Sequence, residues 1–233
     1  MKDWLKREEL LIGKENINKL NNAKVAIFGC GGVGSYVIEA LSRAGVGNFV
    51  LVDNDIVDVT NINRQLVADI TTVGKVKVDI AKEKILRINP EANVITYQKF
   101  YEESNSSELL KSDYTYVVDA IDSVQSKISL IKTCKELNIP IISAMGMGNK
   151  LNPTMIQVLD ISKTEVCPLA KIIRKKLREI GINHLKVVYS KEPVTRFDTS
   201  EENKRTTATI SFMPSVAGLI IASEVVKDII NKK

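Results

Sequence analysis

A glycine-rich turn that directly follows a short apolar run constrains the fold of this chain most. The run KVAIF at residues 24–28 precedes Gly29, Gly31 and Gly34 in G-x-G-x-x-G spacing, and helical spacing of apolar residues begins at Gly34. A strand, a glycine turn and a helix in this order bring free backbone N–H groups and the positive end of a helix dipole to one point, where phosphate binds. Gly29 permits the tight turn, Gly31 the approach of a phosphate and Gly34 close helix–strand packing.

An acidic residue stands at the end of the next apolar run. Residues 49–52 are predicted to form a second strand, and Asp53 follows them at the distance where an acid bonds the ribose hydroxyls of a nucleotide. Strand, turn, helix and acid together predict a nucleotide site. The alternative is a glycine turn used only for packing.

Strand-like and helix-like segments alternate through the first two thirds of the chain. Continuous apolar strands alternating with helices are typical of a parallel sheet covered by helices on both faces. We therefore expect a Rossmann-like, doubly wound, mostly parallel α/β fold, with an N-terminal helical arm over residues 1–22 and a nucleotide-binding domain over 23–149. The expected strands are 24–28, 49–52, 94–97, 114–118 and 140–143, and the expected helices are 34–44, 75–89 and 123–137.

The pattern changes after residue 149. Alternation of apolar and polar residues there predicts a half-exposed antiparallel strand, and a polar stretch predicts a mobile loop. Residues 150–233 are expected to extend the same fold with an antiparallel strand at 154–159, a basic amphipathic helix at 168–180, a mobile loop at 192–207 and a C-terminal helix at 214–230.

Charge and cysteine content narrow the class of protein. The 233-residue chain carries a net charge of +5, a mild excess that suits an anionic partner such as nucleic acid or nucleotide. Cys30, Cys134 and Cys167 form no C-x-x-C pair, so we expect neither a disulfide framework nor a zinc site, and we interpret the thiols as structural. We find no signal peptide and no membrane span, and expect a cytoplasmic protein.

Polar residues beyond the second strand favour ATP over NAD. The stretch DNDIVDVTNINRQ at 53–65 puts Asp55, Asn61 and Arg64 on the ligand side of the sheet, and Lys77 opens the next helix. A triphosphate carries more charge than a dinucleotide, and its leaving group needs Arg, Lys and a metal. Asp122 follows another strand, where a carboxylate can hold Mg²⁺ near phosphates.

Taken together, GCGGVG, LVDNDIVDVTNINRQ, GKVKV and DAIDS resemble the ubiquitin-activating-enzyme-like adenylating superfamily, from about Arg7 to the C-terminus. The resemblance implies an ATP site that contacts Gly29, Gly31, Gly32, Gly34, Asp53, Asp55, Asn61, Arg64, Gln65, Lys77 and Asp122.

The same resemblance implies catalytic roles for four of the charged residues. Arg64 and Lys77 would contact phosphates and support the leaving group, and Asp122 would bind Mg²⁺. Arg7 would reach the nucleotide of a neighbouring subunit, which implies a homodimer. Many relatives carry a second arginine three places earlier, where this chain has Trp4.

Further stretches are similar to a family of tRNA threonylcarbamoyladenosine dehydratases. They include VGSYVIEALSRAGVG, INPEA, NPTMIQVLDISKTEVCPLAKIIRKKLR and ISFMPSVAGLIIASEVVKD. That resemblance implies ATP-dependent dehydration, by cyclisation, of a threonylcarbamoyladenosine beside the tRNA anticodon through activation of its threonyl carboxylate. The alternative is adenylation of the C-terminus of a ubiquitin-like sulfur-carrier protein, against which the missing zinc cysteines count. A NAD-dependent oxidoreductase and a non-catalytic tRNA-binding protein are more distant alternatives.

One surface and three questions remain. The basic side of the helix at 168–180 is either a solvated face or a contact for the tRNA backbone. The sequence leaves open a monovalent cation, a sulfur-relay partner protein and whether ATP is cleaved to AMP or to ADP. The basic residues concerned are Lys171, Arg174, Lys175 and Arg178.

Overall fold

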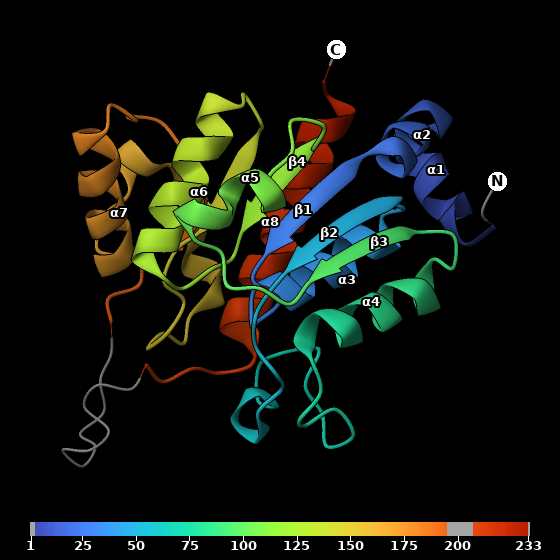
Figure 1. Cartoon of the computed structure of the whole chain (residues 1–233), viewed down its shortest axis with the longest axis horizontal. Helices are drawn as coiled ribbons and strands as arrows, with labels where there is room; N and C mark the ends of the chain where they lie inside the picture. The colour runs from blue at the N-terminus through green and yellow to red at the C-terminus, as the bar shows by residue number, and fades with distance from the viewer. Residues whose placement is uncertain (1–2, 195–206, 233) are drawn as a thin grey trace.

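The chain folds around one seven-stranded sheet, seen in a computed structural model that describes residues 3–194 and 207–232 (Figure 1). The strand order is β3-β2-β1-β4-β5-β7-β6. The strands are β1 (Lys24–Phe28), β2 (Asn48–Val52), β3 (Asn93–Tyr97), β4 (Tyr116–Asp119), β5 (Ile141–Ala144), β6 (Ile156–Asp160) and β7 (Lys186–Ser190).

All neighbouring strands run parallel except the final pair, in which β6 is antiparallel to β7. The expected mostly parallel α/β fold with an antiparallel extension is therefore confirmed. The carboxyl ends of the parallel strands meet at one edge of the sheet, where ligands bind in such folds. The division of the chain at residues 22 and 149 stays a prediction, since β5, β7 and β6 continue the same sheet across the second boundary.

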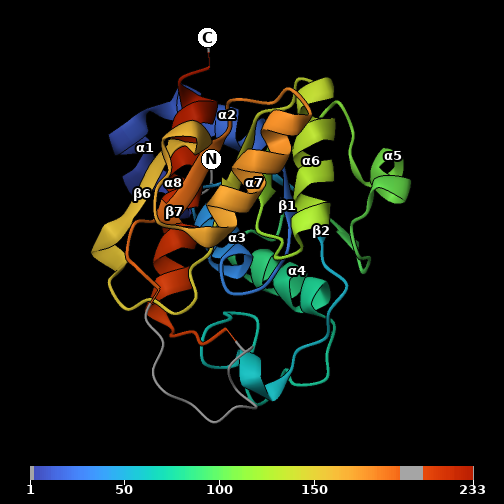
Figure 2. The same cartoon turned by 90° about the vertical axis from the view of Figure 1, so that its left-hand side faces the viewer.

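Helices cover both faces of the sheet, as Figures 1 and 2 show. Alternate residues of β1 explain why its whole run is apolar: Val25 and Ile27 join one core cluster, whereas Ala26 and Phe28 join the other. The first cluster packs under α2 (Lys14–Asn22), α3 (Gly34–Arg43), α4 (Lys77–Ile88) and α8 (Phe212–Ile230). The second packs under α5 (Ser106–Leu109), α6 (Val124–Glu136) and α7 (Pro168–Glu179). The remaining helix, α1 (Lys6–Ile12), packs on α2.

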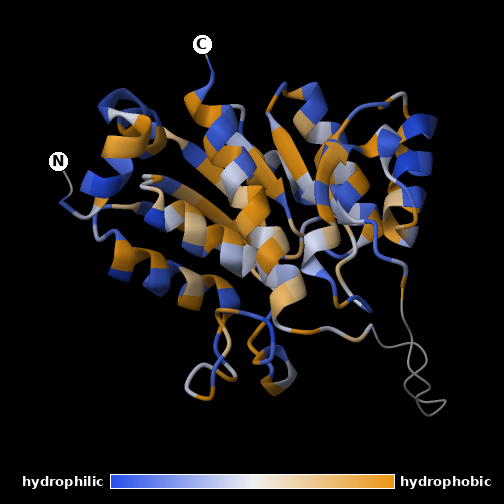
Figure 3. Ribbon diagram, turned by 180° about the vertical axis from the view of Figure 1, so that it is seen from behind, coloured by the Kyte–Doolittle hydropathy of each residue, from blue (hydrophilic) through white to orange (hydrophobic). Residues whose placement is uncertain are grey.

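The long helix α8 returns the chain to its N-terminal half. Seen from behind in Figure 3, apolar residues run along much of its length. Its buried side includes Ala217, Ile221 and Val225, and Gly218 lets it approach α3 so closely that a Cβ there would lie 2.5 Å from the carbonyl oxygen of Val33. Because α3 follows the glycine turn, α8 buttresses the predicted nucleotide site.

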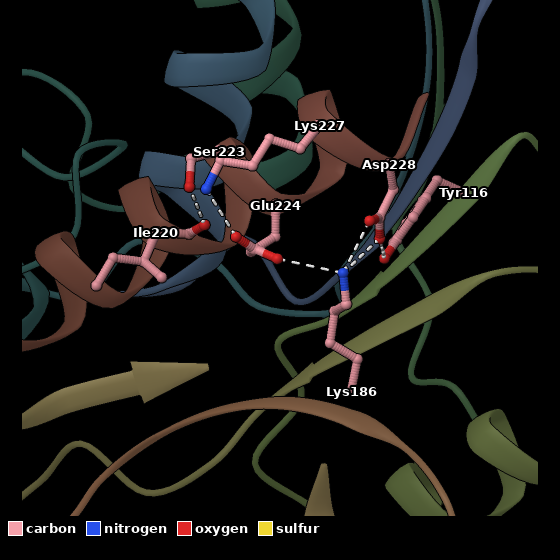
Figure 4. A network of polar contacts seen from close by, with 7 residues as sticks. All are labelled: Tyr116, Lys186, Ile220, Ser223, Glu224, Lys227 and Asp228. Carbon is pink, nitrogen blue, oxygen red and sulfur yellow. Dashed lines mark hydrogen bonds and ion pairs between the residues drawn. The ribbon is translucent and has the colours of Figure 1, made fainter. Parts of the chain in front are cut away.

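A polar network fastens the far end of α8 to the sheet (Figure 4). The Nζ atom of Lys186, at the start of β7, donates to Asp228 at 2.8 Å and to Glu224 at 3.2 Å. The hydroxyl of Tyr116, at the start of β4, donates to Asp228 at 2.6 Å, and Lys227 donates to Glu224 at 2.9 Å. The network lies at the starts of the strands, away from the ligand edge.

The structure departs from the predicted elements in two places, and a third prediction falls mostly outside the described residues. Strand β7 was not predicted. Helix α4 begins at Lys77 rather than at residue 75, because Val76 forms a short antiparallel bridge with Ile56. Most of the loop predicted as mobile, residues 195–206, lies outside the described part of the chain, but Glu192 accepts hydrogen bonds from the backbone of Leu151 and Asn152. Within the described residues no helix is long and apolar enough to cross a membrane.

Candidate functional site

The glycine turn follows β1 in a conformation that requires glycine at two positions. Gly29 has a φ of +92°, and a Cβ on it would lie 2.6 Å from the carbonyl oxygen of Ala120. A Cβ on Gly34 would lie 1.8 Å from the carbonyl oxygen of Gly29. Gly29 therefore serves the turn and Gly34 the close approach of α3 to β1, in keeping with the conformational roles predicted for them.

The middle of the turn is more open, and three side chains surround it. A Cβ on Gly31 would meet nothing closer than Nε2 of Gln65, at 3.7 Å. A Cβ on Gly32 would lie 3.1 Å from Pro214 and 3.6 Å from Cγ of Arg64. The backbone at Gly31 thus has room beside it for a ligand, and Gln65 and Arg64 lie next to that room.

Asp53 shapes the turn directly. Its Oδ2 atom accepts a hydrogen bond of 2.6 Å from the backbone N–H of Cys30, and its Oδ1 atom accepts one of 2.8 Å from the N–H of Asp55. Burial raises the pKa of the Asp53 carboxyl, and these two hydrogen bonds and nearby Lys77 oppose the rise. The residue predicted to hold ribose therefore also anchors the second residue of the turn.

Lys77 is a nearly buried cation at the edge of the site. Its Nζ atom lies 2.8 Å from Oδ2 of Asp55, and 5% of its side chain is exposed against 56% of that of Asp55. The ammonium group is thus held against a carboxylate that remains accessible from solvent.

Arg64 and Asn61 occupy a compact turn after β2. The Nη1 atom of Arg64 donates to the carbonyl of Thr60 at 2.8 Å and to Oδ1 of Asn63 at 2.9 Å. Asn61 is buried, and its Oδ1 atom accepts from the backbone N–H of Asp58 in a capping box. Arg64 is therefore oriented by its neighbours, whereas the carbonyl oxygen of the Asn61 side chain is used to build the turn.

Gln65 supplies an independent sign of a ligand site. Its side chain is buried, and its Oε1 atom has no hydrogen-bond partner among the residues that the structure describes. A buried acceptor without a partner is costly and calls for an explanation such as a bound group. Together with the space beside Gly31, this acceptor fits a nucleotide at the turn.

The turn after β4 carries Asp122 to the same edge of the sheet. The N–H of Ala120 bonds the carbonyl of Phe28 at 2.8 Å, so that this turn lies against Gly29, and Asp122 itself is exposed. Among residues 3–194 and 207–232, no group of three or more His, Cys, Asp or Glu side chains could hold a metal ion. Mg²⁺ bound with a nucleotide needs only one or two carboxylates, because phosphates and water complete its shell, and a single Asp122 fits that requirement.

Two sets of predicted residues lie apart from this site. Arg7 is exposed on α1, and α1 packs on α2. Because α2 leads directly into β1, both helices lie at the starts of the strands, at the end of the sheet opposite the glycine turn (Figure 1). The basic residues of α7 lie on the layer formed with α6. Together with Glu179, these basic residues line a surface depression of about 510 Å³; they are Lys171, Arg174, Lys175 and Arg178.

Arg174 differs from its basic neighbours on α7. Its Nη1 atom donates to the carbonyl and to the hydroxyl of Thr164 at 2.7 and 2.6 Å. Lys171, Lys175 and Arg178 are exposed. The three exposed cations are thus freer to meet an anion than Arg174 is.

All three cysteines are buried and free. Burial raises the pKa of Cys30 well above its ordinary value, with a further rise from Asp53 and a decrease from Lys77. Burial also raises the pKa of Cys134 to about 12, with smaller opposing effects of Asp119 and Lys135. Neither thiol is therefore readily ionised, which agrees with their interpretation as packing residues.

The site and the fold agree with known proteins. A model of the ThiF family matches residues 5–233. This chain belongs to the ThiF family. Its sequence is 46% identical over 237 residues to that of tRNA threonylcarbamoyladenosine dehydratase of Bacillus subtilis. This match spans 96% of this chain and 93% of that protein.

Solved structures give the same result. The Escherichia coli tRNA N6-threonylcarbamoyladenosine dehydratase in complex with ATP matches with a TM-score of 0.89 and 32% identity, over 98% of this chain and 96% of the other. The same enzyme in complex with AMP matches with a TM-score of 0.90. The resemblance to the adenylating superfamily, and within it to the dehydratases, is confirmed.

Several contacts around this ThiF-family site were not predicted from the sequence. Pro214 of α8 packs on Gly32, and the Asn63 amide bonds the carbonyl of Thr209 at 3.1 Å as well as Arg64. A fully buried lysine, Lys127, lies behind the turn that carries Asp122. Only the lysine leaves a signal in the sequence, because it falls in the apolar stripe of its helix.

Proposed function

We propose that this chain catalyses the ATP-dependent dehydration of threonylcarbamoyladenosine beside the anticodon of tRNA. The observation that carries the proposal is the near full-length match to the Bacillus subtilis dehydratase, at 46% identity over 96% of this chain. The geometry of the site supports it, because the space beside Gly31 and the unpaired acceptor of Gln65 suit a nucleotide.

The chemistry requires activation rather than an enzyme nucleophile. A carboxylate is a poor electrophile, since its leaving group would be oxide, and transfer of a phosphoryl or adenylyl group from ATP to the threonyl carboxylate supplies a good leaving group. The carbamoyl group of the same side chain then closes on the activated carbon and expels that group. One water is lost from the nucleoside overall. Because the attacking group is tethered, its effective molarity is high.

The geometry supports a set of nucleotide contacts. Asp53 accepts from the ribose hydroxyls while it continues to hold Cys30. The Gln65 amide donates from Nε2 to a phosphate oxygen, and its Oε1 atom accepts from a hydroxyl of the nucleotide. Arg64 and Lys77 place two cations at the same edge of the sheet, where they offset charge that develops on the leaving group. Asp55 releases Lys77 in part when a phosphate competes for it.

Mg²⁺ is the proposed metal and Asp122 its protein ligand. The ion, when bound, offsets charge on the phosphates of ATP. The exposed position of Asp122, on a turn packed against Gly29, supports this assignment. No residue of the described chain is assigned to a monovalent cation.

We further propose a homodimer in which Arg7 acts on the partner's nucleotide. Arg7 lies at the end of the sheet opposite its own glycine turn, so it serves a site only in another subunit. Its helix exposes Leu10 and Leu11 to 89% and 84%, and Trp4 just before it to 42%. Exposed apolar side chains of this size on one short helix support an interface there.

The exposed cations of α7 are the proposed contact for the tRNA backbone. Lys171, Lys175 and Arg178 present positive charge around one depression, with Arg174 fixed beside them. Phosphate contacts of this kind supply affinity without sequence readout. A tRNA substrate agrees with the cytoplasmic location expected from the sequence. No feature of the described residues identifies a sulfur-relay partner.

ATP consumption tests the proposal. Purified protein would be incubated with Mg-ATP and either tRNA that carries threonylcarbamoyladenosine or the same tRNA transcribed without modification. We expect ATP cleavage only with the modified tRNA. If the ATP carries a label in its adenosine, the labelled product shows whether ATP is cleaved to AMP or to ADP. Cleavage that is equal with both tRNAs, or that instead requires a ubiquitin-like protein ending in Gly-Gly, contradicts the proposal and favours the sulfur-carrier alternative.

A further inference from the structure

Three polar side chains are fully buried behind the turn that carries Asp122. Lys127 of α6, Asp119 at the end of β4 and Ser143 of β5 all have an exposed fraction of 0%. The Nζ atom of Lys127 lies 2.9 Å from Oδ2 of Asp119 and 3.3 Å from Oγ of Ser143. The Ser143 hydroxyl donates a short hydrogen bond to the same Oδ2 atom. We call these residues the buried cluster.

Stability alone does not explain the buried cluster. Taking a lysine and an aspartate out of water costs several kcal/mol, and apolar residues of similar volume usually stabilise a core at least as well. The stripe in which Lys127 lies is otherwise apolar, with Leu130, Ile131 and Cys134 all buried. A charge in that stripe therefore calls for a role other than packing.

The position of the buried cluster indicates this role. Asp119 is paired in register with Phe28, the last residue before the glycine turn. Its other oxygen, Oδ1, accepts from the N–H of Ile121 at 3.2 Å. The carboxylate thus bonds Lys127 and Ser143 on one side, and on the other shapes the first step of the turn toward Asp122.

The second attachment lies just beyond Asp122. Ser123 is the N-cap of α6, and the N–H of Lys127 bonds the carbonyl of Ser123 at 2.9 Å. The Lys127–Asp119 ion pair therefore closes a loop in which Asp122 is held between the end of β4 and the first turn of α6. Ala120, in the same loop, presses its carbonyl against Gly29. A shift of the pair moves both Asp122 and the wall of the glycine turn.

We propose that the buried cluster is a positioning device: it holds Asp122 where its carboxylate meets the metal that accompanies ATP. Lys127, Asp119 and Ser143 touch neither nucleotide nor metal and act through the turn 120–122. The inference rests on the proposed function in one respect only, the assignment of Asp122 to Mg²⁺. It adds positioning residues that the motifs of the family did not identify in this chain.

The test is the effect of Mg²⁺ on nucleotide binding. The dissociation constant of a non-hydrolysable ATP analogue, with methylene between its α and β phosphorus atoms, would be measured with Mg²⁺ and with EDTA. Single variants Asp119→Asn and Lys127→Met each leave a buried group without its partner and can fail to fold. The double variant Asp119→Asn with Lys127→Met removes both charges and keeps the volume.

A matched control removes a second lysine–aspartate pair between the sheet and a helix. The double variant Lys186→Met with Asp228→Asn breaks the network of Figure 4, at the starts of the strands. The variant Asp122→Ala defines the loss expected when the carboxylate itself is missing. Thermal unfolding of every variant establishes that it is folded.

We expect the cluster double variant to bind the analogue in EDTA as the wild type does, and to lose about tenfold or more of the tightening by Mg²⁺, since residues that orient a metal ligand change metal affinity by that order. Asp122→Ala should lose the same tightening and the control should keep it. Full tightening in the folded cluster variant, or in Asp122→Ala, overturns the inference. Failure of the wild type to dehydrate tRNA would overturn the proposed function alone, because this binding test does not depend on that reaction.

Discussion

The side-chain amide of Gln65 lies beside Gly31, with its Nε2 atom 3.7 Å from the position that a Cβ on that glycine would take. The Oε1 atom of the same amide is buried and has no hydrogen-bond partner within residues 3–194 and 207–232. A backbone without a side chain and the Gln65 amide thus lie side by side at the mouth of the glycine turn. Two predictions follow from this pair, and both separate stability from nucleotide binding.

Replacing Gln65 with Met should stabilise the free protein and weaken ATP binding. Removal of the unpaired acceptor should raise the free energy of unfolding by about 1 kcal/mol, which corresponds to roughly 2–4 °C in melting temperature for a chain of this size. Loss of the contact between the Gln65 amide and the nucleotide should weaken the binding of ATP by about tenfold, or about 1.4 kcal/mol. Thermal unfolding and ATP titration check both effects. Gln125→Met on the exposed side of α6 is the control, and unchanged ATP affinity in Gln65→Met would contradict the role assigned to the amide.

Alanine at two glycines of the turn should affect different properties, namely ATP binding at Gly31 and stability at Gly34. Gly31→Ala should leave the free energy of unfolding within about 1 kcal/mol of the wild type, since its Cβ meets no atom closer than 3.7 Å. It should nevertheless weaken the binding of ATP by at least about tenfold, because the added methyl group fills the space next to the backbone. Gly34→Ala should destabilise the fold by about 3 kcal/mol or more, because its Cβ would lie 1.8 Å from the carbonyl oxygen of Gly29. Urea unfolding with and without ATP distinguishes them, and a Gly31→Ala protein that binds ATP normally would place the phosphates elsewhere.

Local sequence pattern was sufficient for the elements that surround this turn. The run at 24–28 and the helix from Gly34 are encoded by adjacent residues, so their bounds follow from apolar spacing and glycine chemistry. Strand β7 is different. Its buried residues, Val187 to Ser190, follow a polar stretch, and no glycine turn or helix begins in residues 191–194, the described residues directly after them. The strand is defined by its pairing with β5 and β6.

Within the site, residue identity was predictable but partnership was not. The motifs indicated Asp53 and Asp122, each at the end of a strand. They did not indicate that Asp53 bonds Cys30, which is 23 residues away, or that Asp119 is paired with Lys127 and Ser143. Contacts of this kind are set by strand order and register, which a single sequence does not contain.

The network that fastens α8 should make stability depend on acid pH. Burial raises the pKa of Glu224, but hydrogen bonds from Lys227 and Lys186 outweigh it and bring the pKa below its ordinary value of 4.5. A group with a depressed folded pKa stabilises the fold above its unfolded pKa and loses that contribution as pH falls through the folded value. Glu224→Gln should therefore cost about 1 kcal/mol at neutral pH and progressively less below about pH 4.5. Urea unfolding of both proteins between pH 3 and 8 checks this, and a difference that grows toward acid would contradict it.

Arg7 and Asp122 should complement each other across a dimer. Each variant, Arg7→Ala or Asp122→Ala, should lose most dehydration activity by itself. In a mixed dimer one site has both lesions and the other has neither, so an equimolar, re-equilibrated mixture should recover about a quarter of wild-type activity. The assay is dehydration after mixing under conditions that exchange subunits. Activity no greater than the average of the two variants would show that Arg7 does not act in trans.

The exposed cations of α7 should control tRNA affinity but not ATP affinity. Lys171→Glu with Lys175→Glu should weaken tRNA binding by tenfold or more and lower the slope of log affinity against log salt by about two, one for each lost phosphate contact. Arg87→Glu with Lys111→Glu changes the same charge at exposed positions outside α7 and should have a smaller effect. Filter binding at several salt concentrations measures the tRNA affinity of each double variant and its dependence on salt. Equal losses in the two double variants would mean that only net charge matters.

The most direct test of the central claim is mass spectrometry of the nucleoside itself. Purified protein, Mg-ATP and tRNA bearing threonylcarbamoyladenosine would be incubated, and the tRNA digested under mild conditions that spare the ring. We predict that this nucleoside loses the mass of one water, that the loss requires ATP, and that Asp122→Ala abolishes it. An unchanged nucleoside mass, with wild-type protein that is folded and binds ATP, would contradict the account.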